Sequence, residues 1–232
     1  MLSLKQRSYQ KELLDDAQIP FEDIKRNMQE LDVINQKLGG HTITIEGVQN
    51  FLISRENALI HIVEIGCGGG DNLRAIKKWA DQKKMNLQLT GIDINRECIA
   101  YAESLQKNKR INFICSDYKI VEFKKIPHII FSSLFCHHFA DEDLVYMLGW
   151  MKQNSTLGFF INDLHRNRFA YYSIKLLTRF FSKSYLVKND APLSVKRGFI
   201  KKDWNKLFTK AGIKEFTCRW KWAFRWLVIY KK

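Results

Sequence analysis

Short apolar runs alternate with amphipathic segments from residue 59 to the end of the chain. The runs are apolar nearly throughout, which is typical of parallel strands that are covered on both faces. The segments between them have apolar residues at helical spacing. The expected strands are residues 59–66, 87–94, 111–117, 127–134 and 156–163, and the expected helices are residues 71–83, 96–107, 141–152 and 201–212.

This alternation, with short connections, predicts an α/β fold with a doubly wound, Rossmann-like sheet. Two further strand-like runs, residues 213–220 and 222–230, lie close together at the C-terminal end. They predict an antiparallel edge pair and complete a seven-stranded sheet that is mostly parallel with an antiparallel C-terminal strand. The segment RWKWAFRWLVIY (219–230) also alternates as one strand with an aromatic face, unless a turn near residues 221–223 divides it.

The N-terminal part of the chain has a different pattern. Residues 1–38 predict two helices around the segment IPFED, and Gly39-Gly40 ends the second of them. A short helix is expected over residues 43–54. We therefore expect an N-terminal helical cap segment, residues 1–55, and a domain of residues 56–232 with a helical insertion at about 164–200.

The insertion is long for a compact fold and is rich in basic and aromatic residues. Its segment RFAYYSIKLLTRFF (168–181) has a helical pattern. Three interpretations stay open for the aromatic face of this helix: it packs over the edge of the sheet, it forms the inner face of a lid over a pocket, or it lies on an anionic membrane. That face contains Phe169, Tyr172, Leu176, Arg179 and Phe180.

Composition narrows the class of protein. A net charge of +14 suits nucleic acid, an anionic membrane surface or an acidic ligand. The chain has no apolar run long enough to cross a membrane and no secretory signal pattern, and its five cysteines lack a CxxC pair. We therefore expect a basic cytoplasmic enzyme with reduced thiols, whereas the sequence does not indicate its oligomeric state.

The segment HIVEIGCGGGDNL (61–73) carries the main chemical motif. A phosphate-binding loop would need Lys-Ser or Lys-Thr after its glycines, and a dinucleotide fingerprint would need GxGxxG, so neither pattern is met. The pattern E-x-G-x-G-x-G is met by Glu64, Gly66, Gly68 and Gly70. Glycines allow a tight turn and a close approach of the backbone to a ligand, and Glu64 can accept a hydrogen bond from an ammonium group.

Two further acids end the next two expected strands. Asp93 is the third residue of GIDI and is placed to accept ribose hydroxyls. Asp117 follows CS in CSDY and could accept an adenine amino group. The carboxyl ends of parallel strands meet in one crevice, so we expect these acids and Glu64 to converge there.

The ordered set EIGCGGG, GIDI and CSDY resembles the class I S-adenosylmethionine-dependent methyltransferases over about residues 50–230. The resemblance implies S-adenosylmethionine as the cofactor and S-adenosylhomocysteine as the product. It also implies further cofactor contacts from residues that neighbour the motif glycines and acids, and from the end of the fourth strand. These residues are Cys67, Ile94, Ser116, Tyr118 and Leu134.

Three later segments, SSLFCHHFADEDLVYML, NDLHRNRFAYY and NDAPLSVKRGF, are similar to a bacterial small-molecule subgroup linked to quinone and type III polyketide pathways. This similarity implies O-methylation of a hydrophobic phenolic, quinone-like or polyketide-derived acceptor. An RNA or protein methyltransferase is the alternative, favoured only by the charge. The Asn/Asp-Pro-Pro-Tyr turn that is usual for amino-group methylation is absent, and we expect nucleic acid not to be a partner.

A phenolic acceptor must lose its proton, and histidine is suited to accept it. The candidates are His137 and His138 after the fourth strand, and His165 after the fifth. Asp163 and Arg166 could orient the His165 imidazole or hold an acidic substrate group, and Asp163 could instead cap the next helix. We expect no catalytic metal, because SSLFCHHF supplies no carboxylate.

Overall fold

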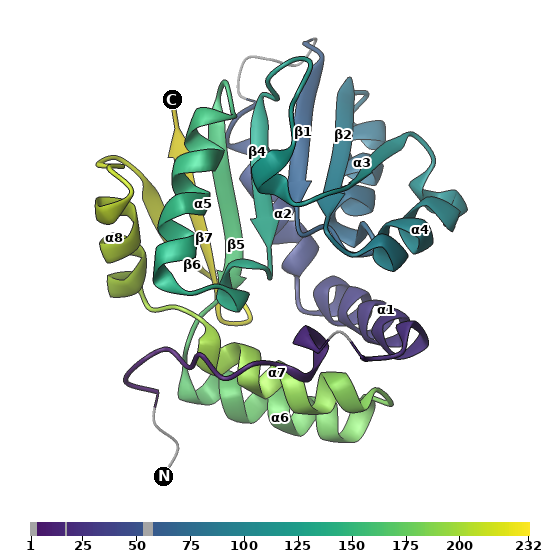
Figure 1. The fold of residues 1–232 in the computed structure, drawn as a ribbon, viewed down its shortest axis with the longest axis vertical. Helices are drawn as coiled ribbons and strands as arrows, with labels where there is room; N and C mark the ends of the chain where they lie inside the picture. Colours follow the sequence, from purple (N-terminus) through teal and green to yellow (C-terminus); the bar gives the residue numbers. More distant parts are fainter. Residues whose placement is uncertain (1–3, 17, 53–57) are drawn as a thin grey trace.

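A seven-stranded sheet forms the centre of the protein, as the computed structural model shows for residues 4–16, 18–52 and 58–232 (Figure 1). Its strand order is β3-β2-β1-β4-β5-β7-β6. Neighbours among β1 to β5 are parallel, whereas β7 runs antiparallel to β5 and to β6. This confirms the predicted sheet. The strands are β1 (Ile60–Ile65), β2 (Leu87–Asp93), β3 (Ile111–Cys115), β4 (Ile129–Ser133), β5 (Gly158–Leu164), β6 (Thr217–Lys221) and β7 (Arg225–Lys231).

Helices cover both faces of the sheet, as expected for apolar parallel strands. Side chains of α2, α3 and α4 pack on one face, and those of α5 and α8 pack on the other. The helices are α1 (Phe21–Lys37), α2 (Gly40–Gln49), α3 (Asp71–Gln82), α4 (Arg96–Ser104), α5 (Asp141–Gln153), α6 (Arg168–Phe181), α7 (Tyr185–Arg197) and α8 (Lys201–Lys210); the short turns are η1 (Leu13–Asp15), η2 (Gln106–Asn108), η3 (Tyr118–Ile120) and η4 (Cys136–His138).

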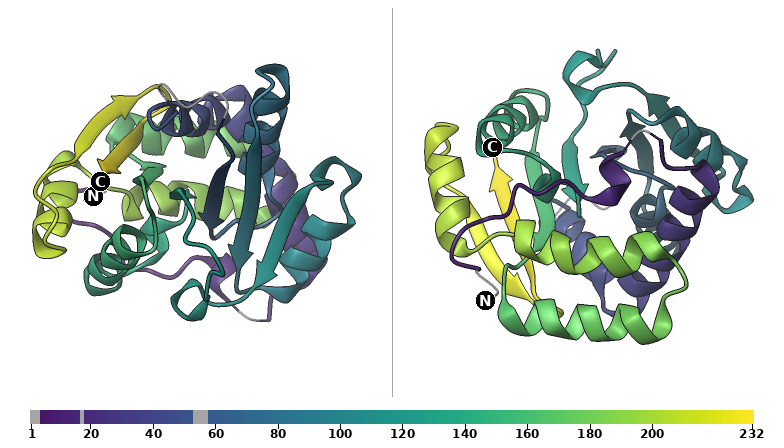
Figure 2. Two further views of the ribbon diagram at one scale, coloured as in Figure 1. Left: turned by 90° about the horizontal axis from the view of Figure 1, so that it is seen from above. Right: turned by 60° about the horizontal axis from the view of Figure 1, so that its bottom comes forward.

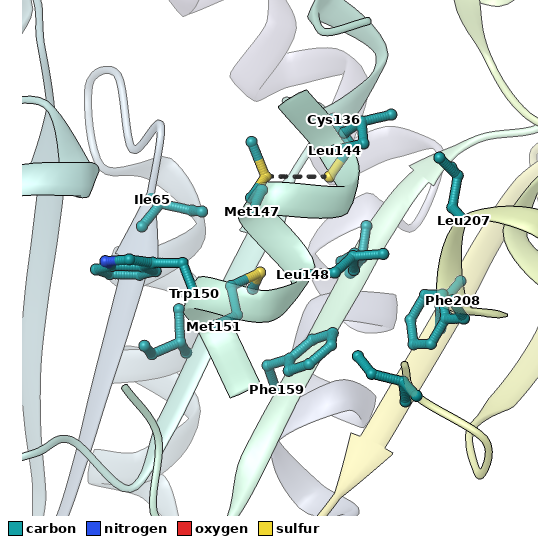
Figure 3. Packing of buried hydrophobic residues seen from close by; sticks show 14 of the residues in the cluster. Ile65, Cys136, Leu144, Met147, Leu148, Trp150, Met151, Phe159, Leu207 and Phe208 are labelled. Carbon is teal, nitrogen blue, oxygen red and sulfur yellow. Dashed lines mark hydrogen bonds between the residues drawn. The ribbon is translucent and has the colours of Figure 1, made fainter. Parts of the chain in front are cut away.

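The two apolar layers are filled by large side chains. On the α5 side, Met147, Leu148 and Met151 pack against Phe159 of β5 and Phe208 of α8 (Figure 3). On the other side, the rings of Phe131 and Phe160 stack with their centroids 4.8 Å apart. This packing fixes the strands, and therefore also the loops that leave their carboxyl ends.

A helical layer lies beyond those carboxyl ends. It consists of α1, α6, α7 and an irregular segment, residues 4–16, which we call the N-terminal strap (Figures 1 and 2). The strap passes across α7, and backbone amides of Leu13 and Leu14 donate to the two carboxylate oxygens of Asp190 at 2.9 and 3.0 Å.

The strap corrects the prediction of a first helix before IPFED. Apart from η1, residues 4–16 do not form a helix. The backbone amides of Ser8, Leu13 and Leu14 bond to α7 in place of an intrahelical ladder. The second predicted helix is present as α1, and the third begins at Gly40, earlier than expected. The expected boundary at residue 55 lies outside the described residues.

A tight turn separates the last two strands, so RWKWAFRWLVIY is not one strand. Residues 222–224 form this turn, and Ala223 and Phe224 both have left-handed φ angles, 57° and 56°. The turn divides the aromatic face: Trp226 is buried, whereas Trp222 is exposed. Within the described ranges of the chain, no helix is both long and apolar enough to cross a membrane.

Candidate active site

A cavity of about 1070 Å³ lies between the carboxyl ends of the strands and the helical layer. Its floor includes the glycine loop after β1 and the loop after β4, and α1, α6, α7 and the β6–β7 turn form its walls. The apolar part of its lining includes Ile24, Met28, Leu31, Phe135, Phe139, Ile174, Leu177 and Val187.

The glycine loop needs glycine for conformational and steric reasons. Gly66, Gly68 and Gly70 have φ angles of 69°, 47° and 73°, which residues other than glycine rarely adopt. A Cβ atom on Gly66 would also collide with the ring of Phe135. The Gly66 amide donates to the Ile92 carbonyl at 2.8 Å, which ties the loop to β2.

Glu64 lies at the end of β1 and is 1% exposed. Its Oε1 accepts a hydrogen bond from Asn72 at 3.0 Å, whereas Oε2 finds no partner among the residues that the structure describes. Burial raises the pKa of the Glu64 carboxyl well above its ordinary value, and the nearby carboxylates of Asp71 and Asp93 add to that shift. An ammonium group would supply the missing donor and favour the ionised form.

Asp93 borders the cavity and also organises the loop. Its Oδ2 accepts from the Gly68 amide at 2.8 Å, and its Oδ1 accepts from the Asn95 amide at 2.9 Å. Burial raises the pKa of the Asp93 carboxyl, although these backbone hydrogen bonds oppose the shift. The neighbouring Ile94 lines the cavity too and is 73% exposed.

The other expected cofactor residues differ in their position relative to the cavity. Gly66, Cys67, Gly68 and Leu134 line it, but within the described chain its lining does not include Glu64, Gly70, Ser116, Asp117 or Tyr118. Asp117 instead caps η3 by accepting from the Lys119 amide at 3.0 Å. Tyr118 is buried, with its ring edge-on to Trp150. Of the three strand-end acids, Asp93 borders the cavity, whereas Glu64 and Asp117 do not belong to its described lining.

These features fit S-adenosylmethionine. The unpartnered Glu64 Oε2 matches an amino-acid ammonium group, the left-handed glycines allow close approach of the backbone, and the Asp93 carboxylate at the cavity edge matches ribose hydroxyls.

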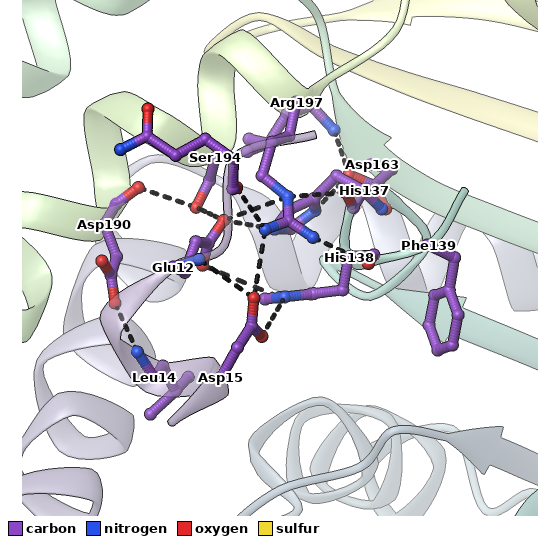
Figure 4. Close-up of polar contacts among 12 residues, drawn as sticks. Glu12, Leu14, Asp15, His137, His138, Phe139, Asp163, Asp190, Ser194 and Arg197 are labelled. Atoms are coloured by element: carbon purple, nitrogen blue, oxygen red, sulfur yellow. Dashed lines mark hydrogen bonds and ion pairs between the residues drawn. The ribbon is translucent and has the colours of Figure 1, made fainter. Parts of the chain in front are cut away.

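A histidine–aspartate pair lies beside this cofactor region (Figure 4). His137 Nδ1 lies 2.8 Å from Asp163 Oδ1, and both residues are buried. Burial works against the charge of Asp163, but attraction to His137 and their hydrogen bond outweigh it and lower the pKa of this carboxyl. The ionised carboxylate can only accept, so Nδ1 donates and Nε2 is left as the acceptor. His137 lines the cavity.

The N-terminal strap completes the surroundings of this pair. Glu12 Oε1 lies 3.8 Å from His137 Nε2, and Asp15 Oδ1 lies 3.2 Å from His138 Nδ1. Burial raises the pKa of the Glu12 carboxyl. Arg197 of α7 holds the arrangement together, because its guanidinium donates to the carbonyls of His137 and His138 and to Asp15 (Figure 4).

His165 occupies a different environment. It follows β5, its ring lies edge-on to Trp226, and it does not belong to the described lining of the cavity. Burial, together with the charge of Arg166, lowers the pKa of its imidazole. Asp163 does not orient this ring as expected, and Asn167 rather than Asp163 caps α6. Arg166 binds the Gly198 carbonyl and Asp203.

Among the residues that the structure describes, two clusters have the donor types and spacing for a metal ion: Glu12, His137 and His138, and Asp32, His41 and Asp71. A guanidinium group lies beside each cluster. Arg197 Nε lies 3.8 Å from Glu12 Oε1, and Arg74 Nη2 lies 2.7 Å from Asp32 Oδ2. A fixed cation beside the ligands opposes metal binding, so the first cluster is better suited to proton transfer.

Sequence reasoning did not identify Glu12, Asp15 or Arg197 as site residues. Arg197 lies in NDAPLSVKRGF, which was singled out only as part of a resemblance. Nothing in the local pattern around these three residues indicates that they meet the histidine pair. The pairing of Asp163 with His137 had one usable signal, because β4 and β5 are adjacent and their carboxyl ends had to lie side by side.

Part of the chain matches a known protein family, and the whole fold is similar to solved structures. Residues 62–154 match the family described as methyltransferase domain. No curated protein matches the chain. Among solved structures, the plantazolicin methyltransferase BpumL in complex with SAH is similar at 22% identity and a TM-score of 0.63, over 84% of this chain and 73% of that one.

Two other solved structures are also similar. Human N-acetylserotonin methyltransferase in complex with SAM has 16% identity and a TM-score of 0.62, over 90% of this chain and 56% of that one. Magnesium protoporphyrin IX methyltransferase from Synechocystis PCC 6803 with bound SAH has 13% identity and a TM-score of 0.55, over 94% and 89%. At these identities the likeness establishes the fold.

The matched domain covers β1 to α5, which includes the glycine loop, Glu64 and Asp93. The residues present there fit the cofactor that the resemblance implied. The protein is therefore a methyltransferase of the class I fold that uses S-adenosylmethionine and releases S-adenosylhomocysteine.

Proposed function

We propose that the enzyme methylates a hydroxyl group of a small hydrophobic aromatic acceptor of the phenolic, quinone-like or polyketide-derived class. The observation that carries this proposal is the buried His137–Asp163 pair in the wall of a largely apolar cavity. Apolar walls favour a hydrophobic acceptor, and an imidazole with a free Nε2 can accept the proton of a phenol.

One half of the cavity is proposed to bind the methyl donor, and the other half is proposed to bind the acceptor. Bound S-adenosylmethionine supplies a methyl group activated by its sulfonium centre. Glu64, the glycine loop and Asp93 hold the donor, with Cys67, Ile94 and Leu134 beside it. Ser116, Asp117 and Tyr118 remain candidates for the adenine end.

His137 is the proposed base in the second half. Its Nε2 takes the hydroxyl proton, while Asp163 fixes the ring through Nδ1 and stabilises the imidazolium that forms. Glu12, 3.8 Å from Nε2, adds a second nearby carboxyl group. His138 bonds to Asp15 and lies at the cavity wall, where it can orient the acceptor. The helical layer keeps water away from the reacting groups.

The test is methyl transfer from labelled S-adenosylmethionine to a panel of alkylphenols and hydroquinones, with bulk RNA and a basic peptide as competing acceptors. His137→Gln should lower kcat by about 100-fold or more while cofactor affinity, measured by calorimetry, is retained. His165→Gln is the matched control and should change kcat only a few-fold. The reverse ranking would assign the base to His165 instead.

The RNA or protein methyltransferase alternative rests on the charge of +14. Label that appears in RNA or peptide, with none in any phenol, would favour this alternative and contradict small-molecule O-methylation.

A further inference from the structure

Helix α6 has an outer face that is apolar and exposed. Five large side chains on this helix of 14 residues are more than half exposed. They are Phe169 (75%), Tyr172 (58%), Leu176 (60%), Phe180 (70%) and Phe181 (82%). Scattered exposed apolar residues are normal, but a contiguous patch of this kind marks a surface that contacts something.

The first four of these residues form one stripe, because their spacing follows the helical repeat. A basic stripe runs beside it, formed by Arg168, Lys175 and Arg179, which are all exposed. The sequence of α6 contains no acidic residue. An apolar stripe flanked by arginine and lysine is the pattern of helices that lie in the plane of a membrane surface.

The inner face of α6 is already occupied. Ala170, Ile174 and Leu177 line the cavity, and the helix packs along α7. The outer stripe is therefore not needed for the packing of the protein on itself. Figure 2 shows α6 along the outer edge of the helical layer, away from the sheet. This placement corrects the lid interpretation, in which the aromatic stripe faced the cavity.

We propose that the outer face of α6 docks the enzyme on an anionic lipid bilayer, with Phe169, Leu176 and Phe180 inserted between headgroups and Arg168, Lys175 and Arg179 beside the lipid phosphates. Charge complementarity selects this occupant over a second copy of the chain. Two copies that met through α6 would bring like-charged stripes together without a carboxylate on either helix to pair with them.

The docking is tested with the full-length protein by flotation with vesicles. Phosphatidylcholine vesicles that contain 30% phosphatidylglycerol, about a physiological anionic content, should carry the protein upward, whereas pure phosphatidylcholine vesicles should not. Binding should weaken as salt rises, because the attraction is screened. Absence of binding to the anionic vesicles at low salt would overturn the proposal.

Two pairs of variants separate the apolar and electrostatic contributions. Phe169→Ser/Phe180→Ser removes apolar anchors and should reduce vesicle affinity about tenfold or more. Its control is Ile120→Ser/Ile126→Ser, at two exposed apolar positions before β4. Lys175→Glu/Arg179→Glu should reduce affinity about 20-fold or more. Its control, Lys124→Glu/Lys125→Glu, makes the same change in net charge at the amino end of β4.

Retention of cofactor affinity by all four variants shows that they are folded. Equal loss of vesicle binding in a variant and its control would overturn the assignment to α6. A dimer in light scattering that Phe169→Ser/Phe180→Ser converts to a monomer would show that a second copy covers this face instead.

Discussion

Asp163 Oδ1 lies 2.8 Å from Nδ1 of His137, although 26 positions separate the two residues in the sequence. The pair joins the ends of two adjacent strands, β4 and β5. Its geometry fixes which ring nitrogen carries the proton and which one faces the acceptor side of the site.

Asp163→Asn is expected to lower kcat by about 100-fold, because the amide no longer enforces the Nδ1–H tautomer and no longer stabilises the imidazolium. The loss should appear as a lower kcat per cofactor-binding enzyme. A purely structural role would reduce the amount of folded enzyme without lowering that kcat. Initial rates, with active protein counted by cofactor binding, distinguish the two.

Glu64→Gln should stabilise the cofactor-free protein and abolish tight cofactor binding. The neutral amide removes a buried carboxylate with an unpartnered oxygen, which corresponds to about 1–3 kcal/mol at neutral pH. Folding raises the pKa of the Glu64 carboxyl. The stability of the wild-type protein therefore falls as the pH rises from the ordinary carboxyl pKa to the raised one, because the buried group then ionises. The stabilisation should therefore grow as the pH rises above the ordinary carboxyl pKa and vanish near pH 4.

Thermal unfolding at several pH values measures that difference. A wild-type protein that is more stable than Glu64→Gln at pH 8 without cofactor would show that the carboxylate has a compensating partner.

Asp93→Asn should weaken the affinity for S-adenosylmethionine by about 10- to 100-fold, because the carboxylate is replaced as the acceptor for ribose and one loop hydrogen bond is weakened. Calorimetric titration measures the change. Glu97→Gln is the control, since it removes the same charge at an exposed position in the first turn of α4. Unchanged affinity in Asp93→Asn would place the ribose elsewhere.

Gly66→Ala and Gly212→Ala form a matched pair for the glycine loop. Their φ angles are almost the same, 69° and 67°, but a Cβ on Gly66 would meet Phe135, whereas Gly212 has open space. Strain alone should cost Gly212→Ala about 1–2 kcal/mol. The added collision should bring Gly66→Ala to about 3–5 kcal/mol. Equal losses in urea unfolding would mean that Phe135 can move aside.

The sequence predicted those features of the fold that depend on neighbouring residues, namely the strands and helices of the sheet and the glycine loop. Strand and helix alternation requires only neighbouring residues, and the glycine loop is defined by φ angles that few side chains allow. The strap was missed because the amides of Ser8, Leu13 and Leu14 bond to α7, and local periodicity cannot indicate such contacts. Helical spacing identified which residues of α6 share a face, but not that the face points outward.

The role of His165 shows a similar limit. Asp163 and His165 are two residues apart, so strand periodicity would place them on one face. β5 ends at Leu164, however, and His165 pairs with Phe199 in an isolated bridge. The alternation that orients Asp163 therefore does not extend to His165.

The N-terminal strap also implies an order of assembly. Ser194 donates to Glu12 and Arg197 donates to Asp15, and each contact spans 182 residues. At ribosomal rates the strap must wait on the order of 10–40 s before α7 has been synthesised. The strands that carry Glu64 and Asp93 emerge much earlier. The growing polypeptide therefore builds its binding groups for the methyl donor first, and the walls that select the acceptor close last.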